Sequence, residues 1–205
     1  MQNIIVALFE VESEGYQALT ELKQNPGTEK SFISQAALLK KENGICNVID
    51  SFDTGANTTD DTVIGGLIGM CVGVLGGPIG VLLGGSMGAL TGMSLDTVDV
   101  IDSISMFEQI TEKLNDNDVA IIGLASEESP DVIDNMLSKY KAIIARFDAA
   151  VIAQEAAKAE ELAIEMERQA KEELRKQHSD EFKDKVEAHR NKMKAQFEEL
   201  KSKFK

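Results

Sequence analysis

The sequence predicts an α+β protein: a ferredoxin-like antiparallel sheet with an inserted glycine-zipper helical hairpin and a long C-terminal helix. Three observations support this prediction. Strand-like apolar runs alternate with helical patterns between residues 3 and 147, an uncharged glycine-rich stretch from Thr62 to Leu95 interrupts them, and helix breakers are nearly absent after residue 148. The expected parts are a ferredoxin-like domain of residues 1–61 and 94–147, a hairpin of residues 62–93, and a helix of residues 148–205.

The first part of the chain is expected to form a strand, a helix and a β-hairpin. Asn3 to Phe9 is apolar and rich in Ile and Val, which predicts a buried strand. The helix that follows ends at Asn25-Pro26-Gly27. Two apolar-rich runs, Phe32 to Lys40 and Ile45 to Ile49, flank Asn43-Gly44, which is a strong short signal for a hairpin. These runs are the predicted second and third strands.

Beyond the glycine-rich stretch, the pattern returns to helices and strands. Apolar residues from Val98 to Leu114 recur at spacings of three and four, as in an amphipathic helix lying on a sheet. Val119 to Leu124 is a predicted central strand, and Ser129-Pro130 begins another helix. Lys141 to Phe147 is interpreted as a fifth strand, with continuation of that helix as the alternative. The order is ferredoxin-like, with the insert between its third strand and second helix.

Eight glycines recur at every fourth position in two runs within the insert. On a helix this spacing leaves a groove of bare backbone that a second helix can approach closely. The sequence Gly76-Gly77-Pro78 separates the runs, so we expect two short helices, over about residues 63–75 and 79–93. The candidate helix-packing residues are Gly65, Gly69, Gly73, Gly77, Gly80, Gly84, Gly88 and Gly92.

The surroundings of this hairpin remain open at the sequence level. It is apolar on every side, so lipid or other protein is expected to cover it. Helices of about 13 and 15 residues reach about 20 to 23 Å, short of the roughly 30 Å core of a bilayer. The sequence predicts an oligomer whether the hairpin is buried in protein or dips into a bilayer. Its flanks are acidic and are expected to be solvated rather than to bind a cation; they carry Asp60, Asp61, Asp96, Asp99 and Asp102.

Charge and residue types exclude several classes of function. The formal net charge of −14 disfavours nucleic acid as a partner, because phosphate binding relies on clustered Lys and Arg. No two insert glycines stand two apart and no Lys or Arg occurs from Glu42 to Glu112, which rules out glycine-rich nucleotide-binding loops. No Ser, Cys or Thr has a recognisable base partner, and the two histidines lack a nearby third ligand. We expect no catalytic residue, no cofactor, no metal site and no enzyme activity.

The last third of the chain predicts one long helix, or two in series, rich in Ala, Glu, Lys and Gln. Its final segment, Lys183 to Lys205, is net positive although the whole chain is acidic. An apolar stripe resembles a coiled-coil seam and needs a partner, either the tail of another subunit, the sheet of its own subunit or an anionic membrane surface. The seam residues are Leu174, His178, Phe182, Val186, His189, Met193, Phe197, Leu200 and Phe204.

With these features in view, the chain resembles a bacterial family known as domain of unknown function twelve sixty-nine. The resemblance rests on the starting strand Ile4-Ile5-Val6-Ala7, the hairpin turn Asn43-Gly44 and the glycine-rich insert, and it covers about Asn3 to Phe147. The family is commonly labelled a predicted membrane protein, and some relatives are described as general stress proteins. The resemblance therefore implies a membrane association and a role in stress, and it supplies no catalytic residues. The tail lies outside it.

The leading hypothesis is a non-enzymatic structural or interaction protein that homo-oligomerises through the zipper hairpin and the tail. The absence of a signal-peptide pattern and the two unpaired-looking cysteines, Cys46 and Cys71, favour the cytoplasm or the cytoplasmic side of a membrane. The alternative is a ligand-binding regulatory domain of ferredoxin-like fold. The position of the hairpin distinguishes the two: it packs against copies of itself in the first case and folds over a pocket beside the sheet in the second.

Overall fold

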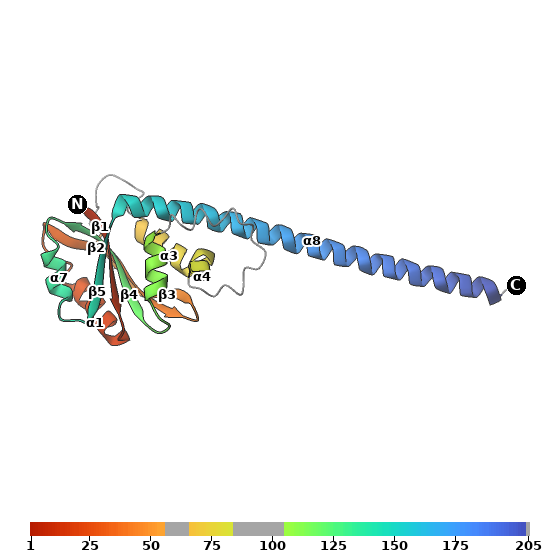
Figure 1. Cartoon of the computed structure of the whole chain (residues 1–205), viewed down its shortest axis with the longest axis horizontal. Coiled ribbons are helices and arrows are strands. Elements are labelled where there is room, and N and C mark those ends of the chain that lie inside the picture. The colour runs from red at the N-terminus through yellow and green to blue at the C-terminus, as the bar shows by residue number, and fades with distance from the viewer. Residues whose placement is uncertain (56–65, 84–104, 204–205) are drawn as a thin grey trace. The chain divides into compact units, whose positions relative to one another are not determined.

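A five-stranded antiparallel sheet forms the centre of the computed structural model, which describes residues 1–55, 66–83 and 105–203 (Figure 1). For residues 81–82, 105, 176–182 and 194–203 it describes the backbone only. The strands are β1 (Gln2–Phe9), β2 (Ser31–Glu42), β3 (Ile45–Asp53), β4 (Val119–Glu127) and β5 (Ala142–Asp148). The helices are α1 (Glu12–Gln24), α3 (Leu67–Gly76), α4 (Pro78–Leu83), α6 (Ser105–Lys113), α7 (Asp131–Leu137) and α8 (Ala149–Lys203). The predicted α+β class is confirmed.

The strand order, β3-β2-β4-β1-β5, is ferredoxin-like in its last four strands. Helix α1 connects β1 to β2 on either side of β4, and α7 connects β4 to β5 on either side of β1. These two interleaved units define the ferredoxin-like arrangement. Residues 141–147 were predicted as a strand, with a helix as the alternative. The strand prediction is confirmed, because β5 occupies this segment from Ala142 onward at the outer edge of the sheet.

The strands and helices that occupy the ferredoxin-like positions differ from the predicted ones. Strand β3, predicted as the third ferredoxin strand, is an additional edge strand that pairs with β2 through the tight Asn43-Gly44 turn. Strand β4 takes the third position, and α7 rather than α6 is the second ferredoxin helix. The reason is burial: nearly every residue of β4 is buried, so this strand belongs between two neighbours at the centre of the sheet. The insert therefore precedes the third ferredoxin strand.

The two faces of the sheet are covered by different helices. On the first face, Ile5, Ala7 and Phe9 of β1 pack in one cluster with side chains of α1 and α7, among them Leu19 and Ile133. The opposite face of β1 carries Ile4 and Val6, which are also buried. Figure 1 shows α3, α6 and the beginning of α8 on this second face. A simple ferredoxin-like sheet has helices on one face only, so the insert and α8 supply a second layer.

The described half of the insert packs on the sheet of its own chain. Leu67, Cys71, Leu75 and Ile79 are at most 1% exposed. We expected lipid or another protein around the hairpin; for these side chains that expectation is wrong, because the second face of the sheet buries them. Helix α3 overlaps the expected first zipper helix, about residues 63–75, and extends one residue beyond it, whereas residues 63–65 lie outside the described ranges. Helix α4 follows directly after Gly77. Residues 84–93 of the predicted second helix lie outside the described ranges.

Helix α8 is a continuous helix from Ala149 to Lys203, as predicted for the tail. The chain divides within it into two compact units, Met1–Ala163 and Ile164–Lys205. In the first unit, Ile152, Ala156 and Ala159 of α8 are buried. In the second unit, ion pairs along the helix link Arg168 to Glu165 and Lys171 to Glu167.

Candidate functional site

A groove of about 470 Å³ lies within the first unit, between the insert helices and α8. One wall is helix α3, which contributes glycines and two apolar side chains, and the other wall is α8, which contributes two alanines and one glutamate. Pro78 and Ile79 of α4 close one side. The lining residues are Gly66, Gly69, Met70, Gly73, Val74, Pro78, Ile79, Ala159, Glu160 and Ala163. The groove is therefore apolar and made mostly of small residues, with one carboxylate.

The glycines of this groove have no neighbour among the described residues. A Cβ atom built on Gly66, Gly69 or Gly73 meets no heavy atom within 4 Å, counting the described parts of the chain. Gly69 and Gly73 are two of the predicted helix-packing glycines. They belong to the exposed side of α3, opposite the buried Leu67, Cys71 and Leu75. The described chain thus leaves a strip of bare helix backbone facing the groove.

Other glycines of the same repeat have a different role. A Cβ on Gly77 would lie 2.6 Å from the carbonyl oxygen of Gly73, and a Cβ on Gly80 would overlap the backbone of Leu75. These two glycines permit the sharp reversal from α3 to α4. Gly65, Gly84, Gly88 and Gly92 lie outside the described ranges. Glycines at the same fourfold spacing therefore serve two roles: some permit the turn between α3 and α4, and others line the open groove. The repeat alone does not distinguish these roles.

Gly76 was treated in the sequence only as part of the turn, but it sets a close contact. A Cβ on Gly76 would lie 2.9 Å from the carbonyl oxygen of Cys46 on β3. The end of α3 can approach the edge of the sheet closely because this residue has no side chain. The Gly-Gly-Pro sequence was the available signal, although it did not reveal which glycine meets a strand.

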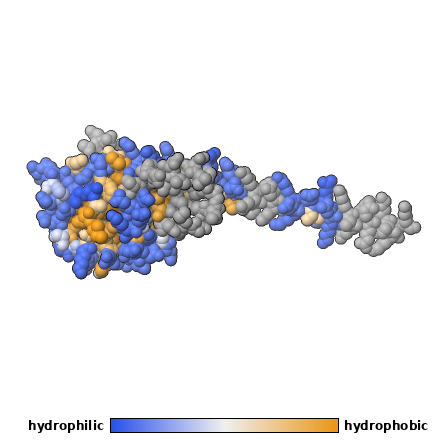
Figure 2. Space-filling view, in the orientation of Figure 1, coloured by the Kyte–Doolittle hydropathy of each residue, from blue (hydrophilic) through white to orange (hydrophobic). Residues whose placement is uncertain are grey.

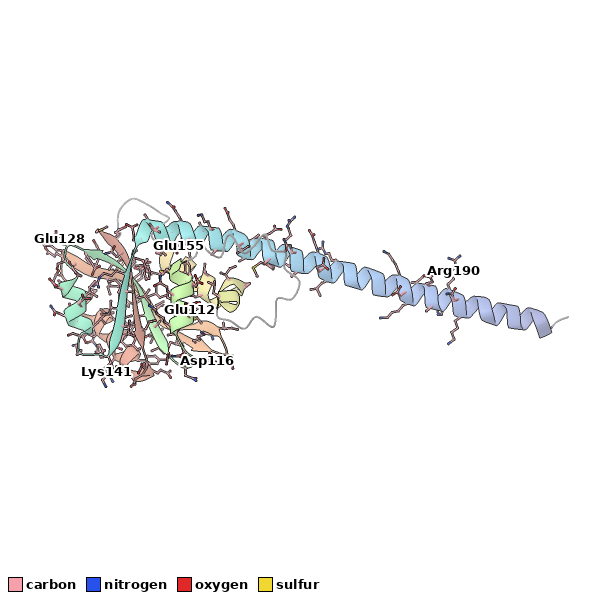
Figure 3. The ribbon with its side chains drawn as sticks, in the orientation of Figure 1. Glu112, Asp116, Glu128, Lys141, Glu155 and Arg190 are labelled. Atoms are coloured by element: carbon pink, nitrogen blue, oxygen red, sulfur yellow. The ribbon has the colours of Figure 1, made fainter. Side chains whose placement is uncertain are left out.

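Two buried charged side chains hold α6 on the second face, and no local sequence pattern indicated either of them. Lys41 of β2 is 7% exposed, and its Nζ donates hydrogen bonds to the carbonyl oxygens of Thr111 (2.7 Å) and Leu114 (2.8 Å) at the end of α6. Glu155 of α8 is 9% exposed, and its carboxylate accepts a hydrogen bond from the backbone N–H of Met106 (3.3 Å) at the start of α6. Figure 3 labels Glu155 on the first part of α8.

The placement of these charges matches the helix dipole. Helix ends leave carbonyl and N–H groups without intrahelical partners, with partial positive charge at the start and partial negative charge at the end. Glu155 is at the start and Lys41 at the end, so each charge is stabilised there. Glu155 also lies about one helical turn before the groove residues Ala159 and Glu160 on α8. The contact with α6 therefore positions the wall of the groove.

The two cysteines are small buried side chains rather than reactive groups. Burial raises the pKa of the Cys46 thiol, an effect that the nearby Lys41 charge partly opposes. Burial raises the pKa of the Cys71 thiol to about 12. Both are free thiols at neutral pH, as expected from the sequence.

The tail seam lies in the second unit, where its described side chains are exposed. Leu174, Val186 and Met193 are each at least half exposed, and His189 is also exposed. For His178, Phe182, Phe197 and Leu200 only the helical backbone is described, and Phe204 lies outside the described ranges. The predicted seam residues therefore lie on a helix. Within the second unit, no described residue covers the apolar side chains of the seam.

Two further observations concern metals and membranes. Within residues 1–55, 66–83 and 105–203, no three His, Cys, Asp or Glu side chains gather into a group able to hold a metal ion. The acidic flank residues Asp60, Asp61, Asp96, Asp99 and Asp102 lie outside these ranges. Over the same ranges, every helix is too short or too polar to cross a bilayer.

Comparison with known proteins gives one match. Residues 62–167 match the model of a family described as "Protein of unknown function (DUF1269)". The match begins with the insert and ends in α8 just beyond the groove, so it includes both walls of the groove. The resemblance described from the sequence covered about residues 3–147 instead. No curated protein and no solved structure matches the chain. Because the matched residues make up more than half of its length, the chain belongs to this family of unknown function.

Proposed function

We propose that this protein is a non-enzymatic interaction protein that assembles with copies of itself, using the groove between α3 and α8 to receive a helix of another subunit. The long helix α8 adds its exposed seam to the assembly. The observation that carries the proposal is the bare backbone at Gly69 and Gly73, which faces a groove of about 470 Å³ and meets no described residue. Small residues on both walls, including Ala159 and Ala163, suit the close approach of a helix.

The helix propensity of glycine supports this role. A glycine in a helix interior destabilises it by about 0.5–1 kcal/mol relative to alanine, and α3 carries such residues at Gly69 and Gly73. Within the described chain nothing requires them, since a Cβ at either position would fit in open space. Close packing of a partner helix against the backbone at these positions would offset this cost. A larger residue at either position would keep the partner helix from approaching so closely.

A substitution at Gly73 separates assembly from folding. Gly73→Leu places a large side chain in the groove, where its Cβ meets no described heavy atom within 4 Å, and Gly73→Ala keeps the surface small. Both favour the helix, so neither should lower the melting temperature of the isolated subunit. Size-exclusion chromatography with light scattering, in the absence of detergent, should find an oligomer for the wild type and for Gly73→Ala, and a smaller species for Gly73→Leu.

Three results would overturn this proposal. They are a wild-type monomer at every concentration tested, a Gly73→Leu protein that assembles like the wild type, and a Gly73→Leu protein that is unfolded rather than a folded, smaller species. The last result would mean that the glycines pack inside their own subunit.

Membrane association and a stress role are the further parts of this proposal, and only the family resemblance supports them. The basic end of the tail, Lys183 to Lys205, would be the contact with an anionic leaflet. Sedimentation with vesicles containing anionic lipid, compared at about 0.1 M and 1 M salt, should show binding that is lost at high salt. Binding that survives deletion of residues 182–205 would remove the tail from this role.

The second candidate is a ligand-binding regulatory domain, and the groove itself favours it. Its volume of about 470 Å³ is within the range of small-molecule pockets. Apolar walls with the single carboxylate of Glu160 suit an apolar ligand that carries a cationic group. In this case the wild-type monomer should bind a cationic amphiphile such as dodecylamine by calorimetry, and Glu160→Gln should weaken binding without changing the subunit mass.

A further inference from the structure

We infer that residues 182–203 of α8 lie flat on an anionic membrane surface, with one apolar stripe of the helix facing the lipid and basic residues along both sides of that stripe. The inference rests on the membrane part of the proposed function and deepens it, because it names the face of the helix that meets the lipid. It assigns this end of the seam to lipid and leaves self-assembly to the groove and the earlier part of α8.

The apolar residues of this segment share one face of the helix. An α-helix turns by about 100° per residue, so the position of each residue in α8 fixes its direction around the axis. Met193 marks the centre of the stripe, with Val186 about 20° to one side and His189 about 40° to the other. Val186 and Met193 are each at least half exposed. By the same register, the other apolar residues within about 40° of the centre are Phe182, Phe197 and Leu200. The stripe is therefore narrow and straight over about six turns of helix.

Basic residues border the stripe on both sides. Lys183 and Arg190 lie about 60–80° from its centre on one side, and Figure 3 labels Arg190. Lys185 and Lys192 lie about 80–100° from the centre on the other side, and all four side chains are exposed. The same two bands contain the remaining basic residues of the segment, Lys194, Lys201 and Lys203. Helices that lie in the plane of an anionic membrane surface have this arrangement, in which long basic side chains extend from the apolar boundary into water.

Acidic residues occupy the opposite face of the same segment. Asp184 lies about 180° from the centre of the stripe and Glu187 about 120° from it. The other acidic residues, about 120–140° from the centre, are Glu198 and Glu199. Figure 2 shows mostly hydrophilic surface on the residues of this segment whose side chains are described. Every basic residue is therefore closer to the stripe than every acidic one, so lipid phosphates beside the stripe would meet positive charge while the acidic face meets water.

The part of α8 just before this segment has a different pattern. In the direction of the stripe, within about 40° of its centre, that part carries Arg168, Lys171 and Arg175. Leu174, the first residue of the predicted seam, lies about 100° away from the centre. The seam is therefore not one straight stripe along its whole length, and the part that suits a lipid surface begins near Phe182.

Charge favours an anionic lipid surface over the tail of a second copy. The residues that border a coiled-coil seam form ion pairs between the helices, often Glu with Lys. Here both borders are basic, so two stripes packed together would bring like charges close in either orientation of the helices. An anionic bilayer instead supplies negative charge on both sides of the stripe and an apolar interior beneath it.

Single tryptophans test which face of the helix meets the lipid. The chain contains no Trp, so an introduced one is the only indole in the protein. Val186→Trp lies at the stripe, and Asn191→Trp, about 160° from its centre, is the matched control. With vesicles of equal parts phosphatidylglycerol and phosphatidylcholine, the emission of Val186→Trp should shift to shorter wavelength and become protected from acrylamide, whereas that of Asn191→Trp should not change. Equal shifts at the two positions, or no shift at either, would overturn the inference. A Val186→Trp shift in buffer that grows with protein concentration would also overturn it, because it would assign the stripe to a second tail.

A rearrangement of charges supplies an independent measurement. One variant keeps the composition and the net charge of the chain but moves two lysines from the borders of the stripe to the back of the helix; its substitutions are Lys183→Asp, Asp184→Lys, Lys185→Asn and Asn191→Lys. Its partition coefficient onto the same vesicles should fall by roughly tenfold or more. A basic residue near an anionic surface contributes about a fivefold factor, and the back of a helix is about one Debye length farther from the lipid.

The matched control exchanges two basic residues that both border the stripe, Arg190→Lys with Lys192→Arg, and it should bind vesicles like the wild type. Wild-type binding by the rearranged variant would overturn the inference while leaving membrane association in place through charge alone. A wild-type protein that binds no vesicles would overturn both, whereas the size of the Gly73→Leu protein in the absence of lipid still tests assembly through the groove.

Discussion

Helices α1 and α7 cover one face of the sheet with a continuous apolar cluster, whereas α3, α6 and the first part of α8 cover the other with apolar side chains and two buried charges. The helices of the first face directly connect strands of the sheet, so the ferredoxin-like connections place them. The helices of the second face come from the insert and the tail. That layer carries the groove. The comparison teaches that the added layer, rather than the shared fold, supplies the candidate binding groove.

The largest expected effect comes from breaking the first face. Phe9 is 1% exposed, belongs to the apolar cluster and meets Tyr140 edge to face with ring centroids 6.5 Å apart. Phe9→Ala should lower the free energy of unfolding by about 3–5 kcal/mol, because it removes buried area and leaves a cavity. Urea denaturation monitored by circular dichroism measures this. A loss below about 1 kcal/mol would mean that the first face is not the principal core.

Replacing Lys41 should promote local unfolding of the helix on the second face without unfolding the first face. Lys41→Met keeps most of the apolar stem but leaves the carbonyl oxygens of Thr111 and Leu114 without their donor. We expect a loss of roughly 2–4 kcal/mol, since each unsatisfied buried group costs about 1–3 kcal/mol. Hydrogen exchange should accelerate in α6 and remain slow in β1. Equal acceleration in both elements would show that the two faces unfold as one unit.

Two neighbouring glycines of α3 should respond with opposite signs. Gly76→Ala places a Cβ 2.9 Å from the carbonyl oxygen of Cys46 and should lower stability by about 1–3 kcal/mol, as overpacking does. Gly73→Ala places a Cβ in open space and should raise stability by about 0.5–1 kcal/mol through helix propensity. Melting of the two variants under identical conditions makes the comparison. The same sign for both would contradict the assignment of Gly76 to a packed contact and Gly73 to the groove.

The buried thiol of Cys71 should give the second face a pH dependence. Burial raises the pKa of Cys71 from its ordinary 9.0 to about 12, so the folded protein retains this proton when the unfolded chain has lost it. Its contribution is complete below pH 9 and is lost as the pH rises toward 12. Between pH 8 and pH 10.5 the wild type should lose roughly 1–2 kcal/mol more than Cys71→Ala. Parallel stability curves for the two proteins would show that the thiol is accessible to solvent.

Local sequence patterns were sufficient to identify most of the elements. The strands, the Asn43-Gly44 turn and the long helix after Asp148 were predicted because alternation, turn residues and the absence of breakers act over a few neighbouring positions. The uncharged insert, its break at Pro78 and the class of the fold were also evident. These features depend on preferences that each segment carries wherever it lies in the protein.

The tertiary structure alone decided which segments meet. Pairing of β4 with β1 and β2, closure of the second face by the insert, and capping of α6 by Lys41 and Glu155 all join residues far apart in the chain. A glycine repeat specifies a small surface but not its neighbour, so Gly76 at a strand, Gly77 at a turn and Gly73 in an open groove look alike in the sequence. Burial is a property of the packed molecule, and only the surroundings of each residue determine whether bare backbone closes a contact or remains available for one.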